Sequence, residues 1–215
     1  MHDIHCHILP GVDDGSSSME ESLAMLAAAK AAGVTEITCT PHCRDPYFDY
    51  DAMWQAFYQF QDAAGDFPLH MGFEVNHHKL MDLGMDWARV LGCYGTADFL
   101  LELSVNASPS RFAEYERTIF ELQGMGYQVI VAHPERYVAI QRDPSLAQEL
   151  VDMGCRLQAS ADFIAGGRLG AEKRPAIELL KMGVYTFIAS DAHNPKHYQM
   201  LAKAMRKYSG YLRTA

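Results

Sequence analysis

The first sixteen residues, MHDIHCHILPGVDDGS, concentrate groups that can bind a metal ion or transfer a proton. His5 and His7 are two residues apart, so on an extended strand their side chains share one face. Asp13 and Asp14 follow in a DDG sequence that is also typical of a turn, so at least one of these carboxylates could be structural. Imidazole and carboxylate groups in this density favour a metal site or acid–base chemistry.

The same residue types recur later in the chain, each time at the end of a hydrophobic stretch. They are His42 in TPH, Glu74 in GFEV, Glu102 in LLELS, His133 in QVIVAH, and Asp191 with His193 in IASDAH. One polar residue at the end of a strand would mean little, since such a residue is usually satisfied by a hydrogen bond. The regular recurrence predicts that these groups meet at the carboxyl ends of parallel strands, where barrel proteins build their sites.

With Asp14 counted, the sequence offers nine candidate metal ligands: His5, His7, Asp14, His42, Glu74, Glu102, His133, Asp191 and His193. Mixed imidazole and carboxylate ligands without a thiolate suit manganese, iron or zinc better than the all-oxygen sites of magnesium or calcium. A tetrahedral site needs only four ligands, so we expect two to three divalent ions, with manganese favoured. Ions that share ligands activate a bridging water and hold a phosphoryl oxygen, which phosphoester hydrolysis needs.

The elements that must position these groups alternate between helix-like and strand-like segments. Ser17 and Ser18, followed by Glu20 and Glu21, predict a helix that starts there and runs to about Ala32. The other predicted helices span 52–65, 110–126, 146–155, 174–183 and 196–208, and the predicted strands span 34–40, 67–75, 97–105, 127–133, 156–160 and 184–190. This alternation predicts an α/β fold with parallel strands. Because an eight-unit barrel takes about 250 residues, we expect a reduced or distorted barrel in one domain, residues 1–215.

Composition excludes several classes of protein. The net charge is −9, and no Lys/Arg cluster offers the basic face that a nucleic-acid-binding protein uses to contact phosphates. No apolar run approaches the roughly 18 residues of a membrane-spanning helix, and no signal peptide is apparent, so we expect no membrane insertion. The five cysteines are scattered without a CxxC pair. Reduced thiols and a cytoplasmic location are therefore expected.

The motifs DIHCHILPGVDDGS, TPH, GFEV, LLELS, VAHPER and IASDAHN resemble those of the PHP (polymerase and histidinol phosphatase) superfamily. More narrowly, they are similar to the bacterial PHP-type protein-tyrosine phosphatases that accompany capsule and exopolysaccharide tyrosine kinases. This resemblance implies a distorted seven-stranded (β/α) barrel with a trinuclear metal centre, and it selects Asp14 over Asp13. It implies one ion held by His5, His7, Glu74 and Asp191, a second by Glu74, Glu102 and His133, and a third by Asp14, His42 and His193.

The same resemblance assigns Arg136, in HPER, to the substrate phosphate, because a guanidinium binds phosphate through two parallel hydrogen bonds. The alternative for Arg136 is an ion pair with Glu135. Relatives usually carry a second arginine just beyond the SDxHN motif, but this chain has NPKHY there. Lys196 or His197 must then serve, or the contact is absent, and Arg44 after His42 is a further candidate.

The resulting functional hypothesis is a metal-dependent phosphoester hydrolase in which a metal-bridging hydroxide attacks phosphotyrosine. The expected partner is a phosphotyrosyl protein, a tyrosine autokinase of polysaccharide export. Aromatic side chains of the 40–54 loop are candidate walls for the substrate ring: Tyr47, Phe48, Tyr50 and Trp54.

Three alternatives compete with this hypothesis. A histidinol-phosphate phosphatase, or another small-molecule phosphomonoesterase, would use the same metal motifs. A nuclease-like module would need a basic groove, which the charge does not suggest. A non-enzymatic module would have lost ligands, whereas all nine are present.

Overall fold

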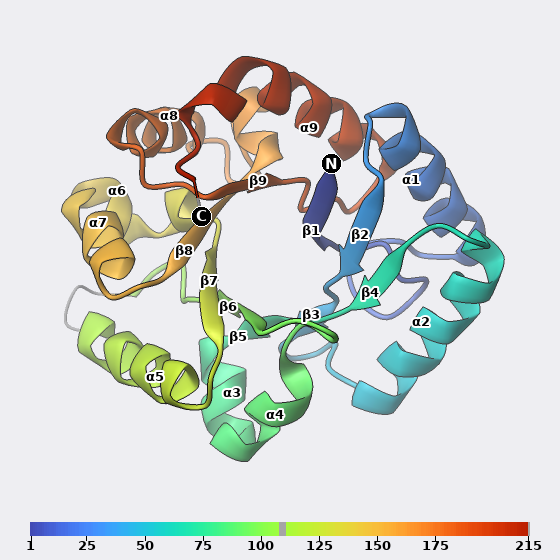
Figure 1. Cartoon of the computed structure of the whole chain (residues 1–215), viewed down its shortest axis with the longest axis horizontal. Helices are drawn as coiled ribbons and strands as arrows, with labels where there is room; N and C mark the ends of the chain where they lie inside the picture. The colour runs from blue at the N-terminus through green and yellow to red at the C-terminus, as the bar shows by residue number, and fades with distance from the viewer. Residues whose placement is uncertain (108–110, 215) are drawn as a thin grey trace.

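The computed structural model describes residues 1–107 and 111–214 as an α/β fold, in which a curled set of strands is surrounded by helices (Figure 1). Every pair of neighbouring strands is parallel, as the alternating sequence pattern predicts. The strands are β1 (His2–Cys6), β2 (Glu36–Cys39), β3 (His42–Cys43), β4 (Leu69–Met71), β5 (Glu74–Asn76), β6 (Asp98–Glu102), β7 (Gln128–Ala132), β8 (Arg156–Ser160) and β9 (Phe187–Ala189).

These strands form a three-stranded sheet, β1-β2-β4, and a six-stranded sheet, β3-β5-β6-β7-β8-β9. The sheets adjoin where two stretches of chain pass from one to the other, between β2 and β3 and between β4 and β5. Near the other edge, a bridge between Cys6 and Ala192 links β1 to the segment after β9. The α/β class and the parallel strands are confirmed, whereas the strand count of a seven-stranded barrel stays a prediction.

The strand expected over 67–75 is two short strands, because the chain is interrupted at Gly72 and Phe73. A Cβ atom at Gly72 would lie 3.0 Å from Cys93 Sγ and 3.2 Å from a Thr38 methyl group, so only glycine passes there without displacing its neighbours. The matching break between β2 and β3 contains Pro41, which has no N–H to donate to a strand ladder. The local contacts of these residues therefore decide where the strands divide.

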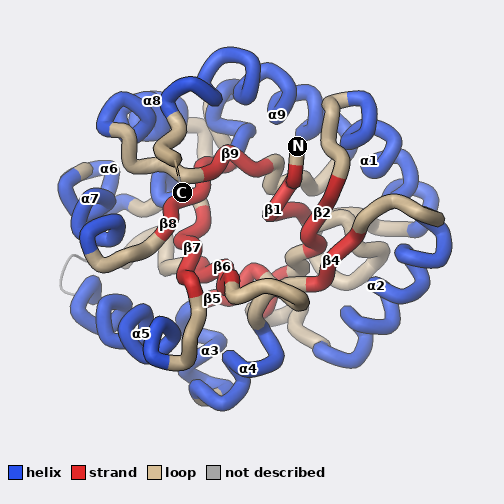
Figure 2. The backbone as a smooth tube through the Cα atoms, in the orientation of Figure 1, coloured by secondary structure: helices blue, strands red, loops and turns tan. Residues whose placement is uncertain are grey.

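Helices cover the outside of the strands (Figure 2). They are α1 (Met19–Ala31), α2 (Tyr50–Ala64), α3 (His77–Leu83), α4 (Ala88–Leu91), α5 (Phe112–Gly124), α6 (Val138–Arg142), α7 (Ser145–Asp152), α8 (Lys173–Met182) and α9 (Pro195–Tyr208). Short 3₁₀ helices are η1 (Met85–Trp87), η3 (Pro134–Arg136), η4 (Ala161–Ala165) and η5 (Ser209–Tyr211). The start predicted for the 110–126 helix, Ser110, lies outside the described residues.

Helix α1 begins as its sequence predicts. Ser18 is the N-cap and its side chain accepts a hydrogen bond from the Glu21 N–H, while the Glu21 carboxylate accepts one from the Ser17 N–H at 2.9 Å. All the longer helices were predicted, whereas α3, α4 and α6 were not, because segments of four to seven residues are too short to show a helical period. Within the described part of the chain, no helix is long and apolar enough to span a membrane.

The hydrophobic core consists of two clusters, and the smaller one lies next to the polar end of the strands. The larger part packs between strands and helices and includes Leu101 and Val131, whereas Leu100 and Ile130 belong to a second, small cluster. Side chains alternate along a strand, so Glu102 lies on the same face of β6 as Leu100, one layer further toward the carboxyl end. This small apolar layer thus precedes the layer in which the candidate ligands are found.

Candidate metal centre

The structure brings all nine candidate ligands together, most of them at or just after the carboxyl end of a strand, with His42 and Glu74 at the start of the short strands β3 and β5. Four overlapping groups have ligand atoms within 4.8 Å of one another: His7 with Asp14, His42 and His193; His5 with His7 and Glu74; His5 with His133 and Asp191; and His42 with Glu74 and Glu102. Most of these side chains are buried, and Asp14 and His193 are the partly exposed members. The groups are built from residues far apart in the chain, so the fold itself assembles them.

Glu74 is the centre of this cluster. One carboxylate oxygen, Oε1, lies 2.6 Å from His133 Nε2 and 3.5 Å from His5 Nε2, and the other, Oε2, lies 2.6 Å from His42 Nδ1 and 3.4 Å from His7 Nε2. Burial alone would raise the pKa of Glu74, but the neighbouring His5 and His42 imidazoles hold it well below its ordinary value. Glu74 therefore presents both oxygens as an anion, as a bridging ligand must. It begins strand β5 rather than ending a strand, a small correction to the sequence prediction.

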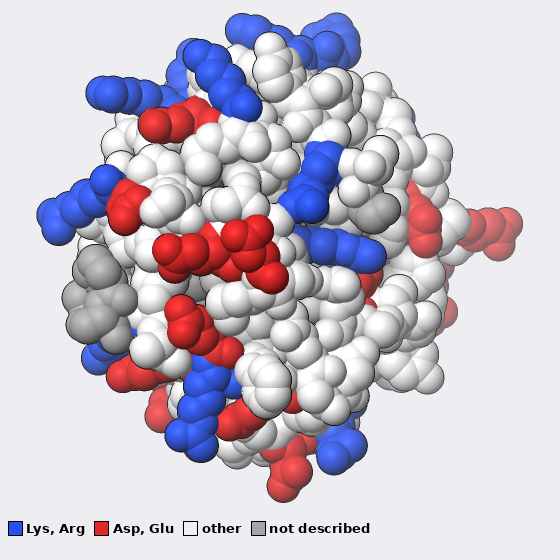
Figure 3. Space-filling view, turned by 60° about the vertical axis from the view of Figure 1, so that its left-hand side comes forward, with Lys and Arg blue, Asp and Glu red and all other residues white. Residues whose placement is uncertain are grey.

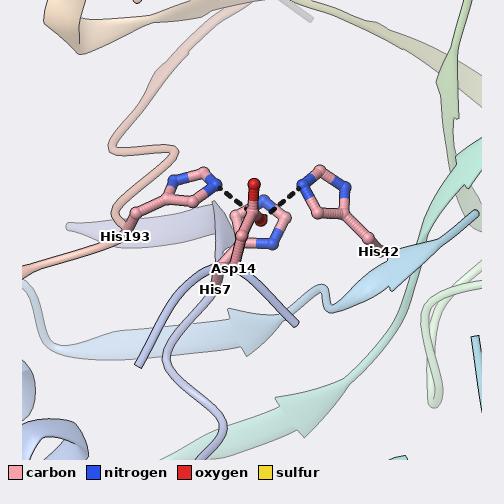
Figure 4. Close-up of side chains that lie close together, drawn as sticks. All are labelled: His7, Asp14, His42 and His193. Carbon is pink, nitrogen blue, oxygen red and sulfur yellow. Dashed lines mark ion pairs between the residues drawn. The ribbon is translucent and has the colours of Figure 1, made fainter. Parts of the chain in front are cut away.

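Asp14 forms the second focus, with imidazoles on either side (Figure 4). Its Oδ1 atom lies 3.1 Å from His42 Nε2 and 3.4 Å from His193 Nε2, and the His7 ring stacks at 4.2 Å from His193. Burial works to raise the pKa of Asp14, but the adjacent His193 and His42 imidazoles hold it far below its ordinary value. The carboxylate is thus ionised and faces three imidazoles, which is a suitable donor set for a transition-metal ion.

Asp13 positions the ligands rather than joining them. Its Oδ2 atom accepts hydrogen bonds from His7 Nδ1 at 2.8 Å and from the His42 backbone N–H at 3.0 Å. Burial would raise the pKa of Asp13, but His7 lowers it to about 2. Because Nδ1 of His7 is engaged, its Nε2 atom is left as the acceptor that faces Glu74 and Asp191.

Gln158 orients His5 in the same way that Asp13 orients His7, by accepting a hydrogen bond from the Nδ1 atom of the ring. Its Oε1 atom accepts a hydrogen bond from His5 Nδ1 at 2.8 Å, and the side chain is fully buried on β8. Gln158 was not predicted from the sequence, although a glutamine within the strand-like RLQAS was the available signal. The outer contacts of both HxH imidazoles therefore direct their Nε2 atoms to the interior.

Arg136 is the last residue of η3, the short helix that follows His133, and its guanidinium contacts Asp191 of the cluster. The NH2 group donates to Asp191 Oδ2 at 2.5 Å, to Ser160 Oγ at 3.1 Å and to Asp162 Oδ2 at 3.4 Å. Burial would raise the pKa of Asp191, but Arg136 keeps it well below its ordinary value. Neighbouring Glu135 takes different partners, the Ser160 N–H and the Tyr185 hydroxyl, so an Arg136–Glu135 ion pair does not account for this arginine.

The remaining predicted phosphate-binding residues differ in their positions. Arg44 adjoins the cluster, since its NH2 group lies 2.8 Å from His42 Nε2. Lys196 is exposed on the first turn of α9, and it is the next residue, His197, that lines the cavity beside the cluster. Arg168, which sequence analysis did not select, donates to Asp14 Oδ2 at 2.6 Å.

A cavity of about 290 Å³ opens beside the cluster, and its wall includes Asp14, Asp191 and His193. Its apolar lining comes from Ala165 and Met200 rather than from the 40–54 loop. Tyr47 of that loop stacks on His42 at 5.9 Å, whereas Tyr50 stacks on Phe73 and Trp54 lines a separate cavity away from the ligands. Only Tyr47 among the four predicted aromatic walls thus contacts a candidate ligand ring within the described residues.

Comparison with known proteins identifies the family. The model for "Capsular polysaccharide synthesis, CpsB/CapC" matches residues 1–210. This chain belongs to the CpsB/CapC family. Its resemblance to capsule-associated phosphatases is thereby confirmed.

Members of the CpsB/CapC family include named phosphatases. Over 202 residues the chain is 33% identical to the tyrosine-protein phosphatase YwqE of Bacillus subtilis, covering 91% of this chain and 78% of the relative. It is 28% identical to the tyrosine-protein phosphatase CpsB of Streptococcus pneumoniae, covering 90% and 83%. A solved structure from the pair YwqE and CpsB, described as unique metal-dependent tyrosine phosphatases, matches with a TM-score of 0.80 and 29% identity over 98% of this chain and 88% of the other.

More distant structures share the fold alone. An adenine deaminase of Arthrobacter aurescens matches with a TM-score of 0.53 at 13% identity, covering 98% of this chain and 90% of that one. This likeness supports the arrangement of strands and helices and carries no statement about the reaction.

Proposed function

We propose that this chain is a metal-dependent protein-tyrosine phosphatase that acts on a phosphotyrosyl protein of capsule or exopolysaccharide synthesis. The observation that carries the proposal is the cluster of nine buried or partly buried imidazoles and carboxylates at one end of the strands. Such a density of ionisable groups is costly to bury unless they hold cations. The relatives at 28–33% identity that are named tyrosine-protein phosphatases support the choice of substrate.

The donor set fits a group of metal ions. Five imidazoles and four carboxylates supply nitrogen and oxygen ligands only, and two of the buried carboxylate oxygens, Asp14 Oδ1 and Glu74 Oε2, have no hydrogen bond of good geometry within the described residues. We infer two to three divalent ions, manganese, iron or zinc with manganese favoured. Glu74 belongs both to the group with His5 and His7 and to the group with His42 and Glu102, which supports a carboxylate that would serve more than one ion. His133 groups with His5 and Asp191 rather than with Glu102, and the group around Asp14 would hold a further ion.

When bound, the ions would acidify a water molecule and neutralise phosphoryl oxygens. The chain's own residues supply orientation. Asp13 orients the His7 ring and Gln158 orients the His5 ring. Arg136 holds Asp191 in place through a hydrogen bond. Arg136 also lines the cavity, where its charge would stabilise a phosphoryl group, and Arg44 lies next to His42, with its guanidinium 3.5 Å from Asp14 Oδ2. Lys196 is exposed, and no contact within the described residues supports a role for it.

A tyrosyl substrate suits this arrangement. The tyrosinate leaving group has an ordinary pKa near 10, far below that of an alkyl alcohol, so its departure requires little help from a general acid. The apolar lining of the cavity by Ala165 and Met200 offers a surface for the ring.

The two sheets together support the description of the fold as a distorted seven-stranded (β/α) barrel. Segments β2 and β3 count as one interrupted strand, and so do β4 and β5, because the Glu74 N–H to Pro41 carbonyl bond of 3.1 Å continues the pairing across both breaks. The bridge between Cys6 and Ala192 and the His7 N–H to Ala192 carbonyl bond of 2.9 Å then close the ring. We propose residues 1–215 as one such metallophosphatase domain.

The proposed partner is a tyrosine autokinase of polysaccharide export, and the proposed location is the cytoplasm. The face shown in Figure 3 carries acidic as well as basic side chains, and the net charge is −9, so this face offers no uniformly basic area for the phosphates of a nucleic acid.

The test compares phosphate release from a phosphotyrosyl peptide and from histidinol phosphate, with one manganese-loaded preparation. We expect a strong preference for the peptide and loss of activity in a chelator. A preference for histidinol phosphate would contradict the tyrosine phosphatase proposal and would make the chain a small-molecule phosphomonoesterase with the same metal cluster.

A further inference from the structure

Two arginines line the cavity beside the metal cluster, and they differ in how firmly they are held. Arg136 is buried and surrounded by Asp191, Asp162 and Ser160. Arg168 enters from the loop after η4 and its side chain is 43% exposed at the edge of the cavity. Arg168 is therefore the guanidinium that an incoming anion meets first.

The present contacts of Arg168 involve atoms that an ion would also need. Its NH2 group donates to Asp14 Oδ2 at 2.6 Å and its NH1 group donates to His193 Nε2 at 3.0 Å. An imidazole nitrogen has one lone pair, so His193 Nε2 cannot serve an ion and a guanidinium together. An ion bound by Asp14 Oδ1 and His193 would leave Arg168 anchored at Asp14 Oδ2 with NH1 free and turned to the cavity.

The loop that carries Arg168 is tied back to the same buried carboxylate that faces Arg136. Glu172 is fully buried, its Oε1 atom accepts the Leu169 N–H at 2.7 Å, and its Oε2 atom lies 3.9 Å from Arg136 Nε. Gly167 adopts φ +80°, and a Cβ atom there would lie 1.4 Å from the Glu172 carboxylate. The loop is thus closed over Glu172, which fixes the base of Arg168 beside the metal cluster.

We propose that Arg168 binds the phosphoryl group of the substrate together with Arg136. The sequence has no arginine just after the SDAHN motif. Lys196, the candidate there, is exposed and does not line the cavity, whereas Arg168 does. The planar fork of an arginine can hold two phosphoryl oxygens, which the ammonium group of a lysine cannot. This inference rests on the proposed phosphatase function and adds to it the residue that selects for the phosphate dianion.

The test replaces Arg168 by alanine and by lysine in the manganese-loaded enzyme. One charge-assisted contact corresponds to about a 10- to 100-fold change in binding, so Arg168→Ala should raise both KM for a phosphotyrosyl peptide and the inhibition constant of inorganic phosphate by about that factor. Arg168→Lys should fall between the alanine variant and the wild type. The matched control is Arg174→Ala, which removes the same charge from an exposed position on α8 and should change neither constant.

Metal content separates this role from the alternatives. We expect Arg168→Ala to retain the wild-type content of manganese. Unchanged KM and phosphate inhibition would overturn the proposal, and so would a parallel loss of manganese and activity, because Arg168 would then serve only Asp14. If the wild-type enzyme hydrolyses no phosphomonoester, the proposed function fails; calorimetric titration of inorganic phosphate into wild type and Arg168→Ala still decides whether Arg168 binds the anion.

Discussion

The two ends of the strands both place histidines beside carboxylates, and they do so with different results. At the amino end, His70 Nε2 lies 2.7 Å from Glu36 Oε1, and His2 Nε2 bonds Thr38 Oγ1 at 2.8 Å. The side chains of His2, Glu36 and His70 are 35–39% exposed, so water satisfies what remains of their hydrogen-bonding capacity. At the carboxyl end, Glu74 alone faces four buried imidazoles.

Residue type alone therefore does not identify the site. An exposed pair of imidazole and carboxylate is a weak surface interaction. Glu74 is shared among four buried imidazoles, and two of these, His5 and His7, have their outer nitrogens already hydrogen-bonded, so their Nε2 atoms are aimed at the carboxylate. That arrangement favours a cation. Burial and sharing, which depend on the whole fold, separate the two ends.

The largest effect should come from the same substitution made at both ends. His133→Ala removes an imidazole that lies 2.6 Å from Glu74, the proposed bridging ligand, so we expect a loss of at least about 1,000-fold in metal-dependent hydrolysis of a phosphotyrosyl peptide. His70→Ala should stay within about twofold of the wild type, since a surface pair contributes little. Steady-state assays at saturating manganese check both. Full activity in His133→Ala, or a matching loss in His70→Ala, would remove the distinction between the two ends.

A smaller effect should follow from the residue that orients a ligand. Asp13→Asn keeps the shape of the side chain but replaces the anion that accepts from His7 Nδ1, so manganese affinity should fall by about 10- to 100-fold. Competition with a fluorescent chelator measures it. Glu36→Gln at the amino end is the matched control and should leave the affinity unchanged. An unaltered affinity in Asp13→Asn would mean that His7 needs no orienting partner.

A third kind of histidine, buried outside the cluster, should have the smallest effect, which is a pH dependence of the free energy of unfolding. His77 is buried and has no carboxylate partner among the residues that the structure describes; it bonds Thr118 Oγ1 at 2.9 Å, and burial lowers its pKa to about 4. The unfolded chain takes up this proton near pH 6.5 and the folded chain only near pH 4, so the free energy of unfolding should fall by about 1–3 kcal/mol as pH decreases through this range.

Urea unfolding at a series of pH values tests this prediction. His77→Phe retains an aromatic ring in the packing against Tyr115 and lacks the titrating group, so its stability should fall less steeply between pH 6.5 and pH 4 than that of the wild type. Equal slopes in the two proteins would show that His77 is accommodated as a cation.

The clustering of the candidate ligands could be predicted from the sequence because a parallel fold places the last residue of a strand, or the residue after it, at the same edge. Glu102, which ends β6, and His133, which follows β7, are predicted by that rule alone. The capping residues of α1 were equally predictable, because Ser18 and Glu21 interact within one helical turn.

Other features depend on contacts between distant segments and could not be predicted. Arg168 and Asp14 are 154 positions apart, and nothing in the local sequence GGRLG brings them together. Lys196 and His197 differ by one position, which is about 100° of rotation on a helix, so the choice between them depends on how α9 packs. The break of 67–75 into β4 and β5 likewise depends on Cys93, which lies against Gly72.

If the nine residues hold a cluster of ions, anomalous X-ray scattering from crystals grown with manganese will locate those ions directly. We expect two or three peaks among His5, Glu74 and Asp14, each about 2 Å from its ligand atoms. Full-occupancy peaks at the His2–Glu36–His70 end, with none at the carboxyl end of the strands, would contradict the account.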